Sequence, residues 1–163
     1  MKVSLSRSFV KGDASWLQGL LGLFYKPARL QIAALCMRPG VTENEILLVS
    51  TRDTGRLILP KGWPESDKQD HETAATEAYE EAGVVGRADP CALGTFSSYK
   101  GRSDGSKLRT RVLVFKLQFE KQLSKFPELG QRQILWLPFS EAVDRANENN
   151  LKRFLRHHRA EIA

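Results

Sequence analysis

The sequence lacks the features that mark membrane-spanning, disulfide-stabilised and zinc-binding proteins. It contains two cysteines, Cys36 and Cys91, with no CxxC pair and no histidine at ligand spacing from either, so neither a disulfide framework nor a zinc site is expected. No run of 18 or more apolar residues occurs, and a spanning helix is therefore not expected either. These absences predict a soluble, cytosolic protein with reduced thiols and no membrane partner.

The sequence also lacks internal repeats, low-complexity tracts and any break in composition. Its 163 residues suffice for one domain with a continuous core. The apolar stretch 16–25 is interrupted by Gln18 and followed by no small-residue cleavage site, so we expect it to pack on the domain instead of directing export. The predicted organisation is an N-terminal segment of uncertain role, 1–28, and one domain, 29–163.

Acidic residues are the minority charge. The chain has 25 Lys and Arg residues against 19 Asp and Glu residues, a formal net charge of +6. Such an excess attracts polyanions, whether nucleic acid, an anionic membrane or a phosphorylated metabolite. Which of these is the partner depends on where the cations lie.

Short apolar runs that end at proline, glycine or charged turns predict a sheet. Four such runs are present, over 30–37, 45–50, 57–59 and 134–137, and the longer stretch 107–119 alternates in the manner of a strand. The glycine-containing stretch 94–105 is predicted to be a polar connection. Beyond the last strand, Ser140 is placed to cap a helix over 141–147, and apolar residues at helical spacing predict an amphipathic helix near 151–158.

A further helix is predicted over 71–82. Asp70 is placed to cap its first free amides, and Gly83 is placed to take the left-handed conformation that ends it. Pro60 and Gly62 precede this helix and favour an irregular loop after the strand 57–59. The expected order is therefore strand, loop and helix.

The C-terminal half of this helix carries Glu77, Glu80 and Glu81 at positions i, i+3 and i+4. Their carboxylates share one face, repel one another by about a few tenths of a kcal/mol per pair, and lie where the helix dipole disfavours negative charge. A solvated acidic face is the common explanation of such a segment. A bound divalent cation is the alternative, because Mg²⁺ prefers carboxylate oxygens and a few acidic side chains.

The segment 59–84, LPKGWPESDKQDHETAATEAYEEAGV, resembles the Nudix box, G-x5-E-x7-R-E-U-x-E-E-x-G-U with U aliphatic. The residues at matching positions are Gly62, Glu77, Ala78, Glu80, Glu81, Gly83 and Val84. Further segments, LLVSTRDTGRLILPKGW, the strand with Arg109 and Thr110, and ILWLPFSEAV, are similar to the diphosphoinositol and diadenosine polyphosphate branch of that family. The resemblance implies an α+β fold, an α/β/α sandwich with a mixed central sheet, the motif helix on one side and C-terminal helices packed around it.

The resemblance also implies a reaction and its residues. Glu77, Glu80 and Glu81 would bind Mg²⁺, for which Mn²⁺ could substitute, and the Gly62 carbonyl would add a ligand. Glu81 would take a proton from the water that attacks phosphorus. The implied activity is hydrolysis of a phosphoanhydride bond, in which metal ions neutralise phosphate oxygens and lower the pKa of the water.

Two positions depart from the motif. The first glutamate of the pattern is Lys68 here, and the arginine is Thr76. In the family that arginine steadies the glutamates by ion pairing, so its loss removes an orienting charge. We expect Lys68 or Arg52 to supply the missing positive charge.

Two groups of cations are placed to bind substrate phosphates. The first flanks the strand that leads into the motif and consists of Arg52, Arg56 and Lys61. The second lies on one side of the strand 107–119 and consists of Lys107, Arg109 and Arg111, although a solvated strand end would give the same pattern. Arginine and lysine select for phosphate density. The predicted substrate is a highly phosphorylated small molecule, such as a diphosphoinositol or dinucleoside polyphosphate, and nucleic acid is not expected.

Two alternatives remain open. The chain could be a Nudix pyrophosphohydrolase that acts on nucleotides or capped RNA, which would need an aromatic side chain to stack on a base. Trp63, Tyr79 and Tyr99 are candidates, whereas Trp136 is expected in the core. Alternatively, the departures from the motif favour a Nudix-fold sensor that binds a phosphorylated ligand without cleaving it. The sequence carries no signal for the oligomeric state.

Overall fold

The computed structural model of this chain describes residues 28–101 and 105–163. The expectations for the segment 16–25 and for most of 1–28 lie outside the described residues. Within the described ranges, no helix is long and apolar enough to cross a membrane. The elements follow in the order β1 (Arg29–Arg38), β2 (Glu45–Ser50), β3 (Leu57–Ile58), β4 (Lys61–Gly62), α2 (Asp70–Ala82), β5 (Val84–Gly101), β6 (Lys107–Gln122), β7 (Ile134–Pro138), α3 (Phe139–Arg145), α4 (Asn149–His157) and α5 (Arg159–Ile162).

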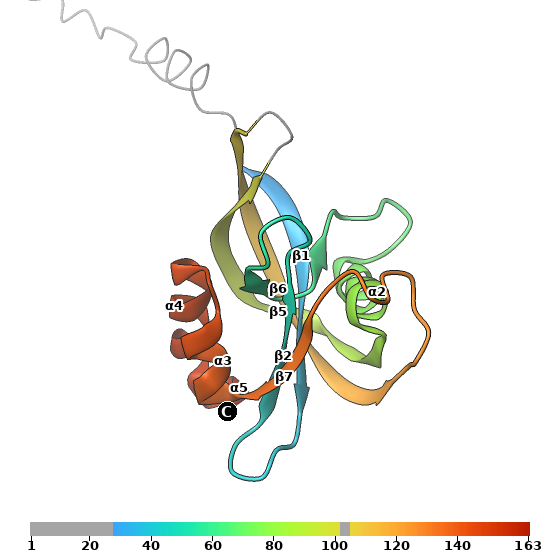
Figure 1. The fold of residues 1–163 in the computed structure, drawn as a ribbon, viewed down its shortest axis with the longest axis vertical. Helices are drawn as coiled ribbons and strands as arrows, with labels where there is room; N and C mark the ends of the chain where they lie inside the picture. The colour runs from blue at the N-terminus through green and yellow to red at the C-terminus, as the bar shows by residue number, and fades with distance from the viewer. Residues whose placement is uncertain (1–27, 102–104) are drawn as a thin grey trace, which may run out of the picture.

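A mixed sheet lies between two layers of helices (Figure 1). Its strands follow the order β3-β2-β1-β6-β5, with β4 paired to β1 and β7 to β2. The β1–β6 pair is parallel and the other pairs are antiparallel. Helix α2 covers one face, and α3, α4 and α5 cover the other (Figure 1). The predicted α+β sandwich is confirmed.

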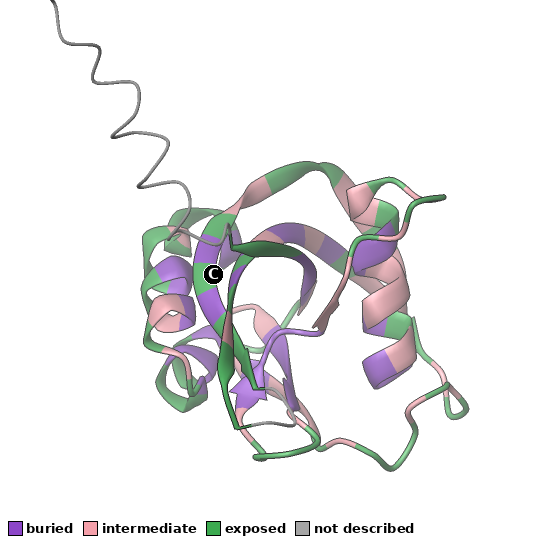
Figure 2. Ribbon diagram, turned by 90° about the horizontal axis from the view of Figure 1, so that it is seen from above, coloured by how far each residue is buried: buried purple, intermediate pink, exposed green. Residues whose placement is uncertain are grey.

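The alternation of side chains along β6 explains how the sheet supports two cores. Val112 and Val114 point to the face covered by the C-terminal helices and join the cluster that contains Phe154. Phe115 and Leu117 point the other way and pack with the small residues of α2. Buried residues accordingly concentrate on the central strands and on one side of each helix (Figure 2). A strand buried on both faces is a rigid support for the residues at its end.

Helix α2 begins one residue earlier than predicted. Its N-cap is Gln69, whose backbone N–H donates to the Glu72 carboxylate at 2.8 Å, so Asp70 is the first helical residue and not the cap. The predicted stop is confirmed, because Gly83 adopts φ of 68° and closes the helix with its N–H on Tyr79 O.

Two other predictions of local structure are wrong. Most of 94–105 is not a connection, because β5 continues to Gly101 and pairs with β6 to its end. Register shifts between Ala88 and Gly94 interrupt the alternation and hide this strand in the sequence. Ser140 is not a cap, since α3 starts at Phe139, and the N–H and hydroxyl of Ser140 both donate to the Glu43 carboxylate.

Candidate functional site

A cavity of about 410 Å³ collects residues from separate parts of the chain at one end of the sheet. The last two turns of α2 supply Glu77, Glu80 and Glu81, and the start of the motif supplies Gly62. Cations that line the same cavity are Arg52, Arg56, Lys61, Lys100 and Arg132. The predicted acidic triad and the first predicted group of cations therefore meet in one pocket.

Glu77 packs against the backbone of β4. A Cβ atom added at Gly62 would collide with the Glu77 carboxylate, so only glycine lets the carboxylate lie over this part of the loop. Burial, together with the negative charges of Glu81 and Glu80, raises the pKa of Glu77 to about 8. The triad is thus crowded and partly removed from water, which is the condition in which a cation stabilises carboxylates most.

Glu81 is held by two donors. Its Oε1 accepts from Arg132 Nη2 at 2.5 Å, and its Oε2 accepts from the Lys61 backbone N–H at 3.3 Å. Both side chains of the ion pair are nearly buried, with 7% of Glu81 and 8% of Arg132 exposed. Burial raises the pKa of Glu81 to about 7, although the Arg132 charge acts in the opposite direction.

Arg132 ties three parts of the site together. Besides Glu81, it donates through Nε to Glu128 at 2.6 Å and through Nη1 to the Ser50 carbonyl at 3.1 Å. Glu128 in turn donates its backbone N–H to the Glu80 carbonyl at 3.0 Å. Sequence reasoning missed Arg132 and Glu128, because nothing in the β6–β7 connection marks it as part of the site.

The predicted source of the missing motif charge is wrong for Glu81. Its ion-pair partner is Arg132, whereas Arg52 lies 3.5 Å from Glu128. Lys68 donates to Glu65 at 2.8 Å and to Thr76 Oγ1 at 3.1 Å. A residue from a different connection therefore supplies the orienting charge that the family takes from α2.

Lys61 and Lys100 bring positive charge into the pocket. Lys61 Nζ donates to the Gln31 amide oxygen at 3.1 Å. Burial lowers the pKa of Lys61, while the charges of Glu148 and Glu81 raise it. Lys100 Nζ lies over the Trp63 ring, 4.9 Å from its centroid, and the Arg29 guanidinium lies 4.8 Å from the same centroid. Trp63 thus contacts two cations, of which Lys100 lines the pocket.

The second predicted group of cations lies outside the residues that line the cavity. Lys107, Arg109 and Arg111 are exposed on β6, paired with the last residues of β5, and are not among the residues that line this cavity. Their phosphate-binding role stays a prediction.

Of the aromatic residues considered for base stacking, Trp63 and Tyr99 line the cavity. Tyr79 does not line it and is 37% exposed. Trp136 packs edge-on against Phe119 with ring centroids 5.2 Å apart, and it borders the α2-side core as expected.

The donor set fits a hard divalent ion that keeps its own waters. Among the described residues, no three His, Cys, Asp or Glu side chains already form a closed ligand cluster, and one oxygen of Glu81 is engaged by Arg132. Mg²⁺ does not need such a cage, because it usually takes one or two carboxylates plus substrate phosphates and waters. Glu77, Glu80 and the second oxygen of Glu81, beside Gly62, meet that requirement.

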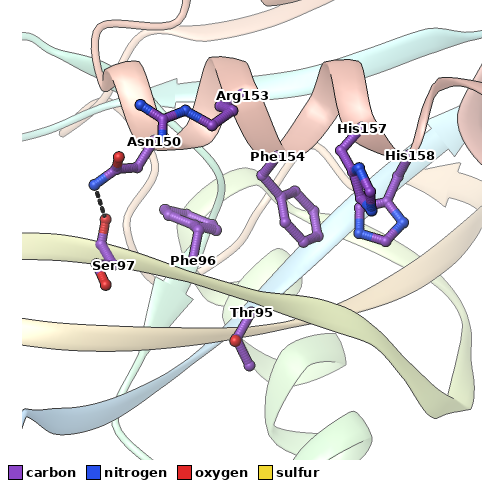
Figure 3. Close-up of a pocket in the computed structure, with 8 residues that line it drawn as sticks. All are labelled: Thr95, Phe96, Ser97, Asn150, Arg153, Phe154, His157 and His158. Carbon is purple, nitrogen blue, oxygen red and sulfur yellow. Dashed lines mark hydrogen bonds between the residues drawn. The ribbon is translucent and has the colours of Figure 1, made fainter.

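A second cavity, of about 500 Å³, lies between β5 and α4 (Figure 3). The Asn150 amide donates to the Ser97 carbonyl at 2.8 Å across it, and the Phe96 and Phe154 rings form its apolar wall, 5.5 Å apart. None of its lining residues in the described chain is a carboxylate. This cavity therefore offers no carboxylate to a hard ion such as Mg²⁺, although His157 and His158 line it, and the acidic triad lies in the first cavity.

The sequence matches the NUDIX domain over residues 29–158. The chain belongs to the Nudix family. The fold, the glycine under Glu77 and the acidic face of α2 are thus those of a Nudix domain in which Lys68 and Thr76 replace two motif residues.

Curated relatives of this Nudix chain include two kinds of hydrolase. "Nudix hydrolase 12, mitochondrial" of Arabidopsis thaliana is 34% identical over 110 residues, which is 64% of this chain and 53% of that protein. Diphosphoinositol polyphosphate phosphohydrolase 3-alpha of Mus musculus is 41% identical over 83 residues, 50% of this chain and 47% of that protein. The chain thus spans about half the length of these relatives. Because the first is named as mitochondrial, the cytosolic location stays a prediction.

Solved structures confirm the fold. The crystal structure of C. elegans Ap4A hydrolase superimposes with a TM-score of 0.61 at 18% identity, covering 84% of this chain and 100% of that one. At this identity the likeness shows the Nudix fold and leaves the substrate of this chain to be argued from its own pocket.

Proposed function

We propose that this Nudix protein is a Mg²⁺-dependent hydrolase that cleaves a phosphoanhydride bond in a highly phosphorylated small molecule, either a dinucleoside polyphosphate or a diphosphoinositol polyphosphate. The observation that carries this proposal is a single cavity lined by the Glu77, Glu80 and Glu81 carboxylates together with Arg52, Arg56, Lys61 and Lys100. Carboxylates alone would repel phosphates, and cations alone would only bind them. Carboxylates that bind a metal ion, next to basic residues that bind phosphates, can both hold the substrate and promote its hydrolysis.

Each residue has a defined task in this scheme. Glu77, Glu80, Glu81 and the Gly62 carbonyl hold Mg²⁺, which when bound neutralises phosphate oxygens and acidifies the attacking water. Arg52, Arg56, Lys61 and Lys100 bind the phosphates that flank the scissile bond. Arg132 and the Lys61 N–H fix the Glu81 carboxylate, which accepts the proton of the water.

Names of relatives support the two substrate classes. One curated relative is a diphosphoinositol polyphosphate phosphohydrolase, and one structural neighbour is an Ap4A hydrolase. Both act on compounds with several phosphates, in keeping with the cationic lining of the pocket.

The test is hydrolysis of a substrate panel by the full chain with Mg²⁺: a diadenosine polyphosphate, a diphosphoinositol polyphosphate, a nucleoside triphosphate and capped RNA. We expect turnover of at least one of the first two. Glu81→Gln should lower kcat about 100-fold or more while the fold, measured by circular dichroism, is kept. Glu120→Gln changes an exposed glutamate of β6 outside the pocket and is the matched control. Tight binding without product in the unmodified protein would instead identify a sensor.

A further inference from the structure

One acidic side chain reaches the pocket from the opposite side of the sheet to α2, apart from the triad and from Asp53 and Glu128. Glu148 immediately precedes α4, as its N-cap residue, and lines the same cavity as the triad. Its Oε2 accepts a hydrogen bond from Ser98 Oγ at 2.7 Å, and Ser98 on β5 is itself buried, with 2% exposed. Since Glu148 makes no side-chain cap for α4, helix formation does not account for its carboxylate.

The surroundings of Glu148 are polar where a sheet face is usually apolar. Thr110 stands between Ser98 and Arg29 in one row across β5, β6 and β1, so these side chains share a face. Thr110 is fully buried, and its hydroxyl has no hydrogen-bond partner among the described residues. Gln31, two residues further along β1, is 1% exposed and lines the pocket. Buried polar groups are costly unless they are paired, and the Thr110 hydroxyl is the one in this group without a partner among the described residues, so the polar residues beside Glu148 point to a function.

The charge of Glu148 determines which substrate groups can bind beside it. A phosphate beside a carboxylate is repelled, because both are negative and the site is partly removed from water. A hydroxyl or amino group is attracted, because a carboxylate has two oxygens with about four acceptor positions and Ser98 occupies one of them. The Glu148 carboxylate therefore favours a hydrogen-bond donor, whereas Arg52, Arg56 and Lys100 of the same pocket favour phosphates.

The two substrate classes of the proposed function differ in this respect. A diphosphoinositol polyphosphate with a phosphate on every ring carbon offers no hydroxyl to Glu148. A dinucleoside polyphosphate offers ribose hydroxyls and base amino groups on either side of a linear phosphate chain. We propose that Glu148, positioned by Ser98, binds a sugar hydroxyl or base amino group and makes this protein selective for nucleotidic polyphosphates. The inference rests on the proposed function and narrows its substrate class.

The test compares kcat and KM of the full chain for diadenosine tetraphosphate and for a fully phosphorylated diphosphoinositol. The unmodified protein should prefer the dinucleotide. In Glu148→Gln, which keeps the side-chain shape, the ratio of the two kcat/KM values should fall at least about tenfold, mainly through a higher KM for the dinucleotide, because a hydrogen-bonding site discriminates by its unpaired groups. Ser98→Ala should shift the ratio in the same direction by a smaller factor. Glu141→Gln, at an exposed glutamate outside the pocket, is the control that leaves the ratio unchanged.

Three results would overturn the inference. One is an unmodified protein that prefers the diphosphoinositol, and another is an unchanged ratio in Glu148→Gln. The third is an equal loss of kcat on both substrates with KM unchanged, which would make Glu148 part of the reaction. If the unmodified protein hydrolyses neither compound, the proposed function fails separately. Selectivity is then measured as the ratio of the dissociation constants of the two compounds, compared between the unmodified and the Glu148→Gln chains.

Discussion

Lys68 Nζ lies 3.1 Å from Thr76 Oγ1, so the two positions at which this chain departs from the Nudix box are in contact. The positive charge of this pair is on Lys68 in the loop, and Thr76 on the helix contributes a neutral hydroxyl. The Glu65 carboxylate also accepts a hydrogen bond from Lys68 Nζ, at 2.8 Å.

This contact predicts the outcome of restoring the motif. In Thr76→Arg the new guanidinium would meet the Lys68 ammonium, so stability should drop by up to about 1 kcal/mol, as for partly exposed charges. Turnover should change by less than about twofold, because Arg132 already pairs with Glu81. Adding Lys68→Glu should recover the stability, which urea unfolding of the four proteins in a double-mutant cycle would measure. A sharp rise in turnover for Thr76→Arg alone would show that Arg132 does not compensate.

Arg132 is predicted to be the most costly arginine to replace. Arg132→Met leaves Glu81 without its cation in a nearly buried place, and loss of one partner of a buried pair costs about 3–5 kcal/mol. Chemical denaturation gives the value. The double variant Arg132→Met/Glu81→Gln should lose less than the sum of the single changes.

Arg145→Met is the matched control for this measurement. Its partner Glu141 also lies at ion-pair distance, 3.1 Å, but the side chains are 43% and 49% exposed, and changes at such a position usually stay within about 0.5 kcal/mol. Equal losses at positions 132 and 145 would contradict a structural role of the Arg132 ion pair.

Gly62→Ala tests the packing of Glu77 against β4. The added methyl group would displace the Glu77 carboxylate, and misplaced metal-site groups typically weaken metal binding about 10- to 100-fold. Titration calorimetry with Mg²⁺ should show that loss. Gly101→Ala, in the same pocket, is the comparison, since its Cβ would make an ordinary contact of 3.5 Å with Asp53. Unchanged Mg²⁺ affinity in Gly62→Ala would remove Gly62 and Glu77 from the metal site.

The raised pKa values of the triad predict how stability depends on pH. Glu77 and Glu81 have pKa values of about 8 and about 7, against 4.5 for an ordinary glutamate. The folded protein thus holds these protons more tightly than the unfolded chain. Their contribution to stability is complete below pH 4.5 and is lost as pH rises through about 7 and 8. In metal-free buffer, thermal unfolding should show this decline.

Mg²⁺ should offset that decline, because it binds the deprotonated carboxylates and stabilises only the folded state. The increase in Tm on adding Mg²⁺ should therefore be larger near about pH 8.5 than near about pH 6. Glu77→Gln should flatten the metal-free curve. Curves that stay parallel in the two proteins would show that Glu77 does not titrate in this range.

Local patterns were enough to predict the sheet, the motif helix and its acidic face. Alternation along β6 and the glycine at position 83 are short-range signals, and they were confirmed. The extent of β5 escaped prediction, because register shifts near Ala88 and Gly94 break the period on which a strand is recognised.

The rest of the pocket depends on contacts between distant segments. Arg132 is 51 positions from Glu81 in the chain, and Glu148 is 50 positions from Ser98. Neither pair leaves a local pattern in the sequence. Compensation for the missing motif arginine was expected from Lys68 or Arg52 because the retained triad needs a positive charge, whereas the folded chain takes the charge from the segment before β7.

The segment between β6 and β7 is fastened to the end of α2 by its backbone. Leu123 N–H donates to the Gly83 carbonyl at 2.8 Å, and Glu128 N–H donates to the Glu80 carbonyl at 3.0 Å. The length of this segment is consequently set by the distance from these two hydrogen bonds to Arg132. Most surface connections tolerate insertions and deletions, but this one should not. An insertion or deletion there would misalign the acidic helix as surely as a change within the motif, so in the evolution of this chain the two segments should vary in length only together.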